Sequence, residues 1–362
     1  MITNQINPRV EKLQHYLSTQ SIEGLLVTDK PNKFYLSGFN GTDVALLITK
    51  DLSWIIADGR YLEEIKKEVT GFSVIDNKGD MIKTLVSLVK DQQLTCLAVE
   101  ADNLTLKWFL EMQHGLKGQC DLFPTQHIIE QLRMIKEPAE LAILKKAAEL
   151  TDLVYDHCLK ITKPGMTEAM LAVELEHYMR QQGADGCSFE TIVASGNRSA
   201  MPHGHASHKL LAKGELVTVD FGVRYQGYYT DMTRTFAIGQ VMPELKHIYK
   251  IVNLAGLKAF GELKAGMTTG DLDQICRDYI YQAGYGDYYN HGTGHGIGLS
   301  CHEYPYIKTG LTEVLQKEMT FTIEPGIYLP DYGGVRIEDD IYLNSQGYGE
   351  SLTKSTRDWI EL

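Results

Sequence analysis

Residues 215–239 read ELVTVDFGVRYQGYYTDMTRTFAIG. In the first half of this stretch apolar and polar side chains alternate, which is the period of a β-strand with one buried face. The second half, after a polar turn, repeats the alternation. The stretch therefore predicts two antiparallel strands, with the apolar residues on one face and an aspartate on the other face of each strand.

The turn between these strands sets how the two aspartates face each other. A two-residue turn at Gln226–Gly227 places Asp220 opposite Thr233 and makes Asp231 the diagonal neighbour of Asp220 on the same face. Diagonal neighbours lie about 7–8 Å apart, so both carboxylates can reach a common ion. A slip of one residue would turn one aspartate to the apolar face.

Residues 319–343, MTFTIEPGIYLPDYGGVRIEDDIYL, predict a second strand pair of the same kind. Glu324 lies on the polar face of the first strand, and a loop around Pro330-Asp331 leads into the return strand. That strand carries Arg336, Glu338 and Asp340 on one face. Glu324 and Glu338 are expected to approach each other across this hairpin.

Four carboxylates that meet in one cleft require compensation, because burying unpaired negative charge is costly. Two divalent cations would supply it. Two metals about 3.5–4 Å apart polarise a carbonyl and lower the pKa of a bridging water, which is hydrolytic chemistry. Carboxylates with one imidazole suit manganese, cobalt, iron or zinc. Any one of these acids alone would more often be a solvated surface residue.

A glycine-rich strip, HGTGHGIGLSCH at residues 291–302, offers the imidazole. His291 and His295 have the spacing of a zinc-protease helix, but the glutamate that should follow the first histidine is Gly292. Repeated glycines also make a helix unfavourable. In an extended chain the two histidines lie about 13 Å apart, so at most one of them belongs to a given metal site.

The chain as a whole predicts an α/β protein of two domains with a boundary near residue 127. Residues 1–127 alternate helical and strand patterns, and FYLSGFNGTD (34–43) is interpreted as a polar connecting loop. A long helix begins near Pro138. In residues 128–362 the segments 163–183 and 264–284 share K-x-G-M-T and a closing Gln-x-Gly, which predicts a duplicated helix–helix–strand unit around one cleft.

Composition limits the class of partner and compartment. At 362 residues and a net charge of −12, the chain is not expected to bind nucleic acid or anionic membranes. The N-terminal residues lack the apolar core of a leader, and six scattered cysteines favour the reducing cytoplasm. DFG at 220–222 lacks the other kinase motifs, and the glycine strip lacks the dinucleotide pattern G-x-G-x-x-G.

Five motifs together resemble the metal-ligand motifs of the "pita-bread" metallopeptidases, the family of aminopeptidase P, prolidase, methionine aminopeptidase and creatinase. They are VDFG, TDMTRT, HGTGHGIG, TIEPGIY and GGVRIEDD. The resemblance covers essentially the whole chain, because a creatinase-like N-terminal domain marks the proline-specific branch. It implies a creatinase-like α/β domain (1–127) followed by a pseudo-twofold pita-bread catalytic domain (128–362).

The resemblance also implies roles for individual residues. The metal ligands would be Asp220, Asp231, His295, Glu324 and Glu338, holding two divalent ions, manganese above all, with cobalt, zinc or iron as alternatives. Asp231 and Glu338 would bridge the ions, and Glu324 would also shuttle a proton. His203 and His302 would contact the substrate carbonyl, His291 would line the substrate pocket, and Arg336 would orient the site.

The implied activity is hydrolysis of the Xaa-Pro bond in a peptide with proline second, by a cytoplasmic homodimer. Residues 34–47 and 188–204 are similar to small bacterial aminopeptidase P enzymes, which favours release of the first residue from longer peptides. A strict Xaa-Pro dipeptidase (prolidase) remains the alternative. A non-catalytic binding module on the same fold is a third possibility, against which the complete ligand set argues.

Overall fold

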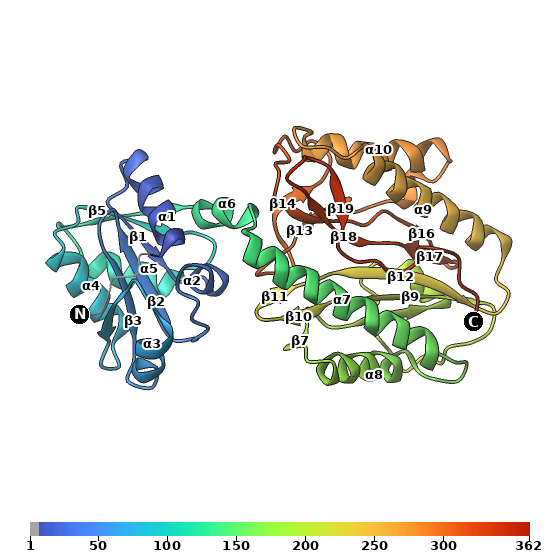
Figure 1. Ribbon diagram of the computed structural model, residues 1–362, viewed down its shortest axis with the longest axis horizontal. Helices are drawn as coiled ribbons and strands as arrows, with labels where there is room; N and C mark the ends of the chain where they lie inside the picture. Colours follow the sequence, from blue (N-terminus) through green and yellow to red (C-terminus); the bar gives the residue numbers. More distant parts are fainter. Residues whose placement is uncertain (1–6) are drawn as a thin grey trace. The chain divides into compact units, whose positions relative to one another are not determined.

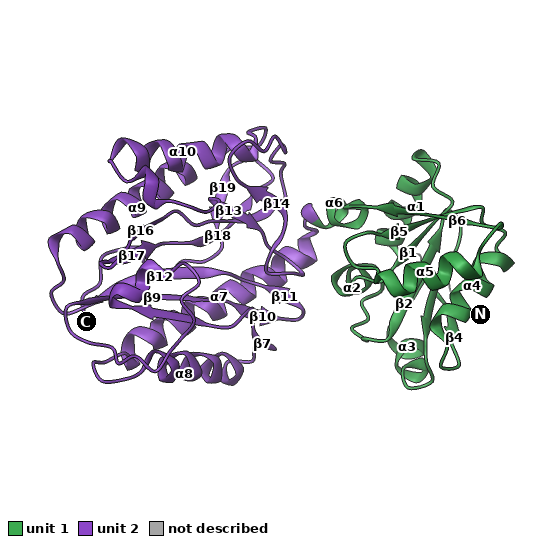
Figure 2. Ribbon diagram, turned by 180° about the vertical axis from the view of Figure 1, so that it is seen from behind, with its two compact units in different colours: residues 1–133 green, residues 134–362 purple. Residues whose placement is uncertain are grey.

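The structure, a computed structural model, describes residues 7–362 and divides into two compact units, Met1–Arg133 and Met134–Leu362 (Figure 2). We predicted the boundary near residue 127, just before helix α6 (Ile128–Met134). The two units divide at the end of this helix, between Arg133 and Met134. The first six residues of the N-terminal stretch that lacks a leader-like pattern lie outside the described residues.

Unit 1 is the α/β domain that the alternating patterns predict, built on a six-stranded mixed sheet of order β4-β3-β2-β1-β5-β6 (Figure 1). Strand β2 is antiparallel to both its neighbours, whereas β3/β4, β1/β5 and β5/β6 are parallel. The elements are α1 (Pro8–Thr19), β1 (Gly24–Val27), α2 (Lys30–Ser37), β2 (Val44–Thr49), β3 (Ser53–Ala57), α3 (Leu62–Glu68), β4 (Ser73–Asp76), α4 (Met81–Asp91), β5 (Cys96–Glu100), α5 (Leu106–Gly115) and β6 (Asp121–Thr125).

Helix α2 corrects one prediction, because the start of the segment that we interpreted as a polar loop is helical. The Asp29 side chain caps the helix by accepting from the Asn32 amide at 3.2 Å, and Gly38 ends it with a φ of 73°. Three of its polar residues, Asn32, Lys33 and Ser37, are buried, and the Lys33 ammonium donates to the Val44 carbonyl at 2.8 Å. A short helix that buries polar groups shows no apolar stripe, so its pattern is that of a loop.

Unit 2 consists of two similar halves, as the repeated segments predict. Thr167 caps α8 and Thr268 caps α10, each by accepting from a backbone amide of its own helix. In Figure 1 the α7–α8 pair lies in front of and below the strands of the first half, and the α9–α10 pair lies above the strands of the second half. The elements of the first half are α7 (Pro138–Ile161), α8 (Glu168–Gln181), β7 (Gly186–Cys187), β8 (Ile192–Ser195), β9 (Glu215–Phe221), β10 (Val223–Tyr225), β11 (Tyr228–Tyr229) and β12 (Met232–Ile238). Those of the second half are α9 (Pro243–Glu262), α10 (Thr269–Gln282), β13 (Gly294–Gly296), β14 (Glu303–Ile307), β15 (Thr320–Ile323), β16 (Gly326–Leu329), β17 (Gly333–Arg336), β18 (Asp339–Leu343) and β19 (Gly349–Ser351).

The strand pair in residues 215–238 has the predicted register. Gln226 and Gly227 form the turn, both with positive φ (48° and 82°), as a tight hairpin turn requires. Tyr225 therefore pairs with Tyr228, and further along Asp220 pairs with Thr233. The alternation of residue types and the turn together determine which side chains share a face.

The second acidic strand pair, like the first with β9/β12 and β10/β11, is divided between two sheets, although we predicted one hairpin in each case. Strand β15 pairs with β18, and β16 pairs separately with β17. The two registers are continuous, since Ile323 faces Asp339 and Gly326 faces Arg336. Glu324 therefore falls opposite Glu338, as expected.

The glycine-rich strip is extended for only three residues, β13, and a bulge follows His295. A Cβ on Gly294 would lie 2.0 Å from the Thr322 carbonyl oxygen, and one on Gly296 would lie 2.2 Å from that of Tyr304. The backbones of strands β15 and β14 pass so close that only glycine fits at these two positions. This close packing brings His295 between the two acidic strand pairs.

Candidate metal centre

Asp220, Asp231, His295, Glu324 and Glu338 all line one cavity of about 460 Å³. The strands bring them together: Asp220 is in β9, Asp231 directly precedes β12, His295 is in β13, Glu324 directly follows β15 and Glu338 directly precedes β18. Donor atoms of Asp231, His295 and Glu338 lie within 4.8 Å of one another. The five predicted ligands thus come from both halves of unit 2 and meet at one place.

Three of the carboxylates have one oxygen held by the protein. Arg336 Nη2 lies 2.5 Å from Asp220 Oδ2, the Thr233 hydroxyl donates to Glu338 Oε2 at 2.7 Å, and the Cys301 thiol donates to Asp231 Oδ2 at 3.3 Å. Among residues 7–362 no group donates a hydrogen bond to the second oxygen of these carboxylates, Asp220 Oδ1, Glu338 Oε1 and Asp231 Oδ1, although all three oxygens are buried. Buried acceptors without donors indicate a site for cations.

The acids also repel one another. Burial raises the pKa of Asp231 and Glu324 well above their usual values, and the neighbouring charge of Glu338 raises both further. Burial, followed by the charge of Asp220, raises the pKa of Glu338 to about 8. Without a cation, the protein can keep these side chains together only by leaving some of them protonated.

His295 has the tautomer that metal binding requires. Its Nδ1 lies 3.1 Å from the Gly296 carbonyl oxygen and therefore carries the proton. Nε2 then presents a lone pair to two carboxylate oxygens, 3.6 Å away on Asp231 and 3.6 Å away on Glu324. Burial lowers the pKa of His295 to about 3, so the ring stays neutral at neutral pH. A lone pair facing two carboxylates fits a bound cation.

Arg336 connects the acids to the substrate side of the cavity. Its Nη1 donates to the Tyr328 hydroxyl at 2.9 Å, and Tyr328 lies 2.8 Å from His291 Nε2. Because His291 Nδ1 faces the Gly292 carbonyl at 2.7 Å, Nε2 accepts the tyrosine proton. Burial lowers the pKa of His291 to about 4. Tyr328, which orients both residues, ends the TIEPGIY motif, but we assigned it no role from the sequence.

The other two predicted histidines line the same cavity and are exposed at its wall. His302 lies in the loop before β14 and its ring centroid is 4.1 Å from that of His295. His203 lies in the loop between β8 and β9.

Asp340 was also given no role from the sequence, although its carboxylate accepts the Asp231 backbone N–H at 3.1 Å. Asp340 is two residues from Glu338 and therefore shares its strand face, which was the available signal for a role at the site.

Known proteins show the same two-part organisation. The profile of metallopeptidase family M24 matches residues 142–345, and that of the creatinase/prolidase N-terminal domain matches residues 9–135. A Xaa-Pro dipeptidase of Pyrococcus horikoshii is 35% identical, over 98% of this chain and 99% of its own. The structure of a Xaa-Pro dipeptidase from Bacillus anthracis is 41% identical with a TM-score of 0.95, covering 98% of this chain and 99% of that one.

An X-Pro aminopeptidase from Thermotoga maritima is also similar, at 36% identity and a TM-score of 0.87, covering 94% of this chain and 98% of that one. These matches confirm the fold predicted from the five motifs, a creatinase-like domain followed by a pita-bread domain. This chain belongs to metallopeptidase family M24 and is a peptidase.

Proposed function

We propose that this peptidase hydrolyses the bond between an N-terminal residue and a following proline, using two divalent metal ions. Asp220, Asp231, His295, Glu324 and Glu338 would hold the ions. The observation that carries the proposal is the set of buried carboxylate oxygens, beside the lone pair of His295, that accept no hydrogen bond from the described residues. Manganese is the metal that we propose first, with cobalt, zinc or iron as alternatives.

Different side chains of the protein have different roles in the proposed reaction. When bound, the metal ions would supply Lewis-acid activation of water and of the substrate carbonyl. Glu324 accepts the proton of the attacking water and returns it to the proline nitrogen as the bond breaks. His203 and His302, at the cavity wall, donate hydrogen bonds to the carbonyl oxygen as it gains negative charge. Arg336 keeps Asp220 and Tyr328 oriented through its hydrogen bonds.

Metal removal followed by a peptide panel tests the proposal. Dialysis against a chelator should abolish hydrolysis of Ala-Pro, and added manganese or cobalt should restore it, as measured by release of free alanine. Ala-Ala is the matched control substrate and should remain uncleaved. Protein that binds metal but cleaves no Xaa-Pro peptide under any metal would instead favour the non-catalytic binding module.

The length of the peptide distinguishes two forms of the activity, and we propose the dipeptidase form over the aminopeptidase P form that the sequence favoured. Two of the three relatives described above are Xaa-Pro dipeptidases. Lys308 and Arg336 are the cationic side chains on the cavity wall, and the Arg336 guanidinium already contacts Asp220. Lys308, being exposed, is available for the free carboxylate that proline carries only in a dipeptide.

Lys308→Ala should therefore raise KM for Ala-Pro by roughly three- to tenfold, the effect of losing one partly exposed charge pair. It should leave the kinetics of Ala-Pro-Ala unchanged, and Lys308→Arg should restore the dipeptide KM. Lys250→Ala, on the exposed side of α9, is the control. Equal effects on both peptides, or faster turnover of the tripeptide by the wild type, would favour aminopeptidase P.

We also propose a cytoplasmic homodimer. The six cysteines form no disulfide, which suits a reducing compartment. Among residues 7–362 there is no helix long and apolar enough to cross a membrane. Sedimentation analysis of the purified protein tests the oligomeric state.

A further inference from the structure

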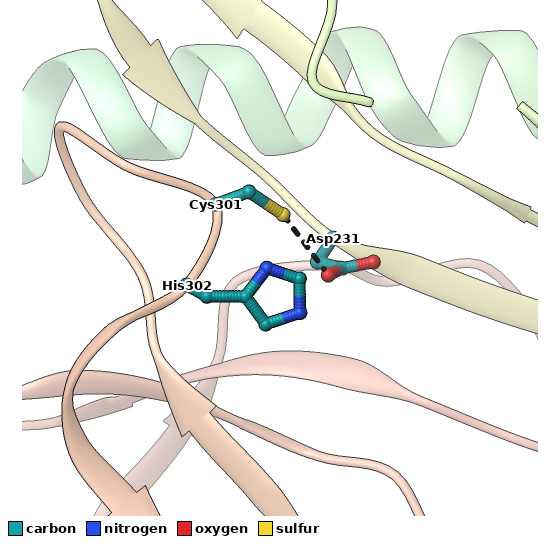
Figure 3. A group of neighbouring side chains, drawn as sticks. All are labelled: Asp231, Cys301 and His302. Carbon is teal, nitrogen blue, oxygen red and sulfur yellow. Dashed lines mark hydrogen bonds between the residues drawn. The ribbon is translucent and has the colours of Figure 1, made fainter. Parts of the chain in front are cut away.

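A second group of metal-binding side chains adjoins the centre described above. Among residues 7–362, two groups of three side chains have suitable donor atoms within 4.8 Å of one another, Asp231–His295–Glu338 and Asp231–Cys301–His302. Figure 3 shows that Cys301 and His302, which are adjacent in the loop before β14, both approach Asp231. The Cys301 sulfur is 3.3 Å from Asp231 Oδ2.

An ion pair and a hydrogen bond, both made by Glu303, hold this loop in place. Lys136 Nζ forms a buried ion pair with Glu303 at 2.8 Å, and the side chains are 1% and 6% exposed. Glu303 also accepts the backbone N–H of Ser300 at 3.3 Å. The residues on both sides of Cys301 and His302 are thereby anchored, so the thiol and the imidazole are preorganised beside Asp231.

The donor set differs in chemistry from the oxygen-rich set of the five proposed ligands. Sulfur, imidazole nitrogen and carboxylate oxygen together are a set that zinc and cadmium accept readily, whereas manganese prefers oxygen ligands. The carboxylate of the set also has room for a cation, because Asp231 is 4% exposed and its Oδ1, which the centre described above shares, accepts no hydrogen bond from residues 7–362. Binding of a thiophilic ion would release the thiol proton to solvent and replace the S–H···O contact by two metal–ligand bonds.

We propose that Asp231, Cys301 and His302 form an accessory site for thiophilic divalent ions, zinc above all, and that its occupation inhibits the peptidase. Inhibition follows because two of the three ligands are shared. Asp231 would lose an oxygen to the accessory ion, and His302 could no longer donate to the substrate carbonyl. The inhibitory part rests on the proposed function, whereas the binding part does not.

Cadmium is the probe of binding, because a cadmium–thiolate bond gives an ultraviolet charge-transfer band that does not depend on activity. The manganese-loaded protein, titrated with Cd²⁺, should develop the band with a single equivalent. Cys301→Ser should remove it, and Cys301→Ala provides a second variant if the serine variant folds poorly. Cys187→Ser, a half-buried cysteine in β7, is the control and should keep the band.

Inhibition is tested by measuring the inhibition constant of Zn²⁺ for Ala-Pro hydrolysis at saturating manganese. Loss of the thiolate ligand should raise the inhibition constant for zinc roughly tenfold or more in Cys301→Ser, and Cys187→Ser should leave it unchanged. Absence of the band in the wild type, or an equal band or equal inhibition in Cys301→Ser, overturns the accessory site. A band in a protein that cleaves no Xaa-Pro peptide overturns the proposed function and leaves the accessory site supported.

Discussion

Glu338→Gln should remove most of the peptidase activity and at the same time stabilise the metal-free protein. Loss of one proposed metal ligand should lower kcat/KM more than about 100-fold, since partners that only support a ligand already account for about 10- to 100-fold. The neutral amide should raise the free energy of unfolding of the metal-free protein by about 1–3 kcal/mol, because it removes the free-energy cost of keeping a buried carboxyl protonated at neutral pH. Metal content, Ala-Pro turnover and thermal melting of chelated protein are the measurements.

The pH dependence of the melting temperature tests whether the shifted pKa of Glu338 is the origin of this stabilisation. The pKa of Glu338 is raised from 4.5 to about 8, so over this interval the folded metal-free protein holds a proton that the unfolded chain has released. The resulting stabilisation is complete below the unfolded value and is lost as pH rises through the folded value. Chelated wild type should therefore melt at lower temperature near pH 8 than near pH 5. A Glu338→Gln variant with an equally steep decline would contradict this origin of the effect.

Glu324→Gln should lower kcat for Ala-Pro by about 10²- to 10⁴-fold, the contribution of a positioned proton-transfer group. The glutamine keeps the size of the side chain and one oxygen near His295, but it can no longer accept and return a proton. Steady-state kinetics at saturating manganese, with bound metal measured on the same sample, is the test.

The matched control for this variant is Glu350→Gln, which removes a carboxylate that pairs with Lys145 at 2.9 Å on the surface. It should leave kcat within about twofold of the wild type, as for other exposed ion pairs. A Glu324→Gln variant that retains wild-type kcat with full metal content would exclude Glu324 as the proton carrier.

The strand registers around the site were predictable, because they depend on local chemistry. Alternating apolar residues and the Gln226–Gly227 turn were sufficient to place Asp220 opposite Thr233. Continuity of the second register across Pro325 placed Glu324 opposite Glu338 in the same way. Two-residue periodicity carries this information wherever one face of a strand is buried.

Contacts between distant segments were not predictable in this way. The carboxylate of Asp340 accepts the amide of Asp231 from 109 positions away, and Tyr328 contacts His291 from 37 positions away. No periodicity within either segment encodes such a pairing. The prediction of a loop where α2 begins was wrong for a related reason. Lys33 is buried because its ammonium donates to the Val44 carbonyl, a contact that a short polar sequence does not reveal.

The division of the five proposed ligands between the repeated halves has an evolutionary consequence. Asp220 and Asp231 come from the first half, and His295, Glu324 and Glu338 come from the second. The halves are also joined here, since the Glu338 amide donates to the Thr233 carbonyl at 3.0 Å. If an ancestral gene encoded only one such unit, its product could have formed this centre only by self-association. Fusion of two copies would then have made the activity independent of protein concentration.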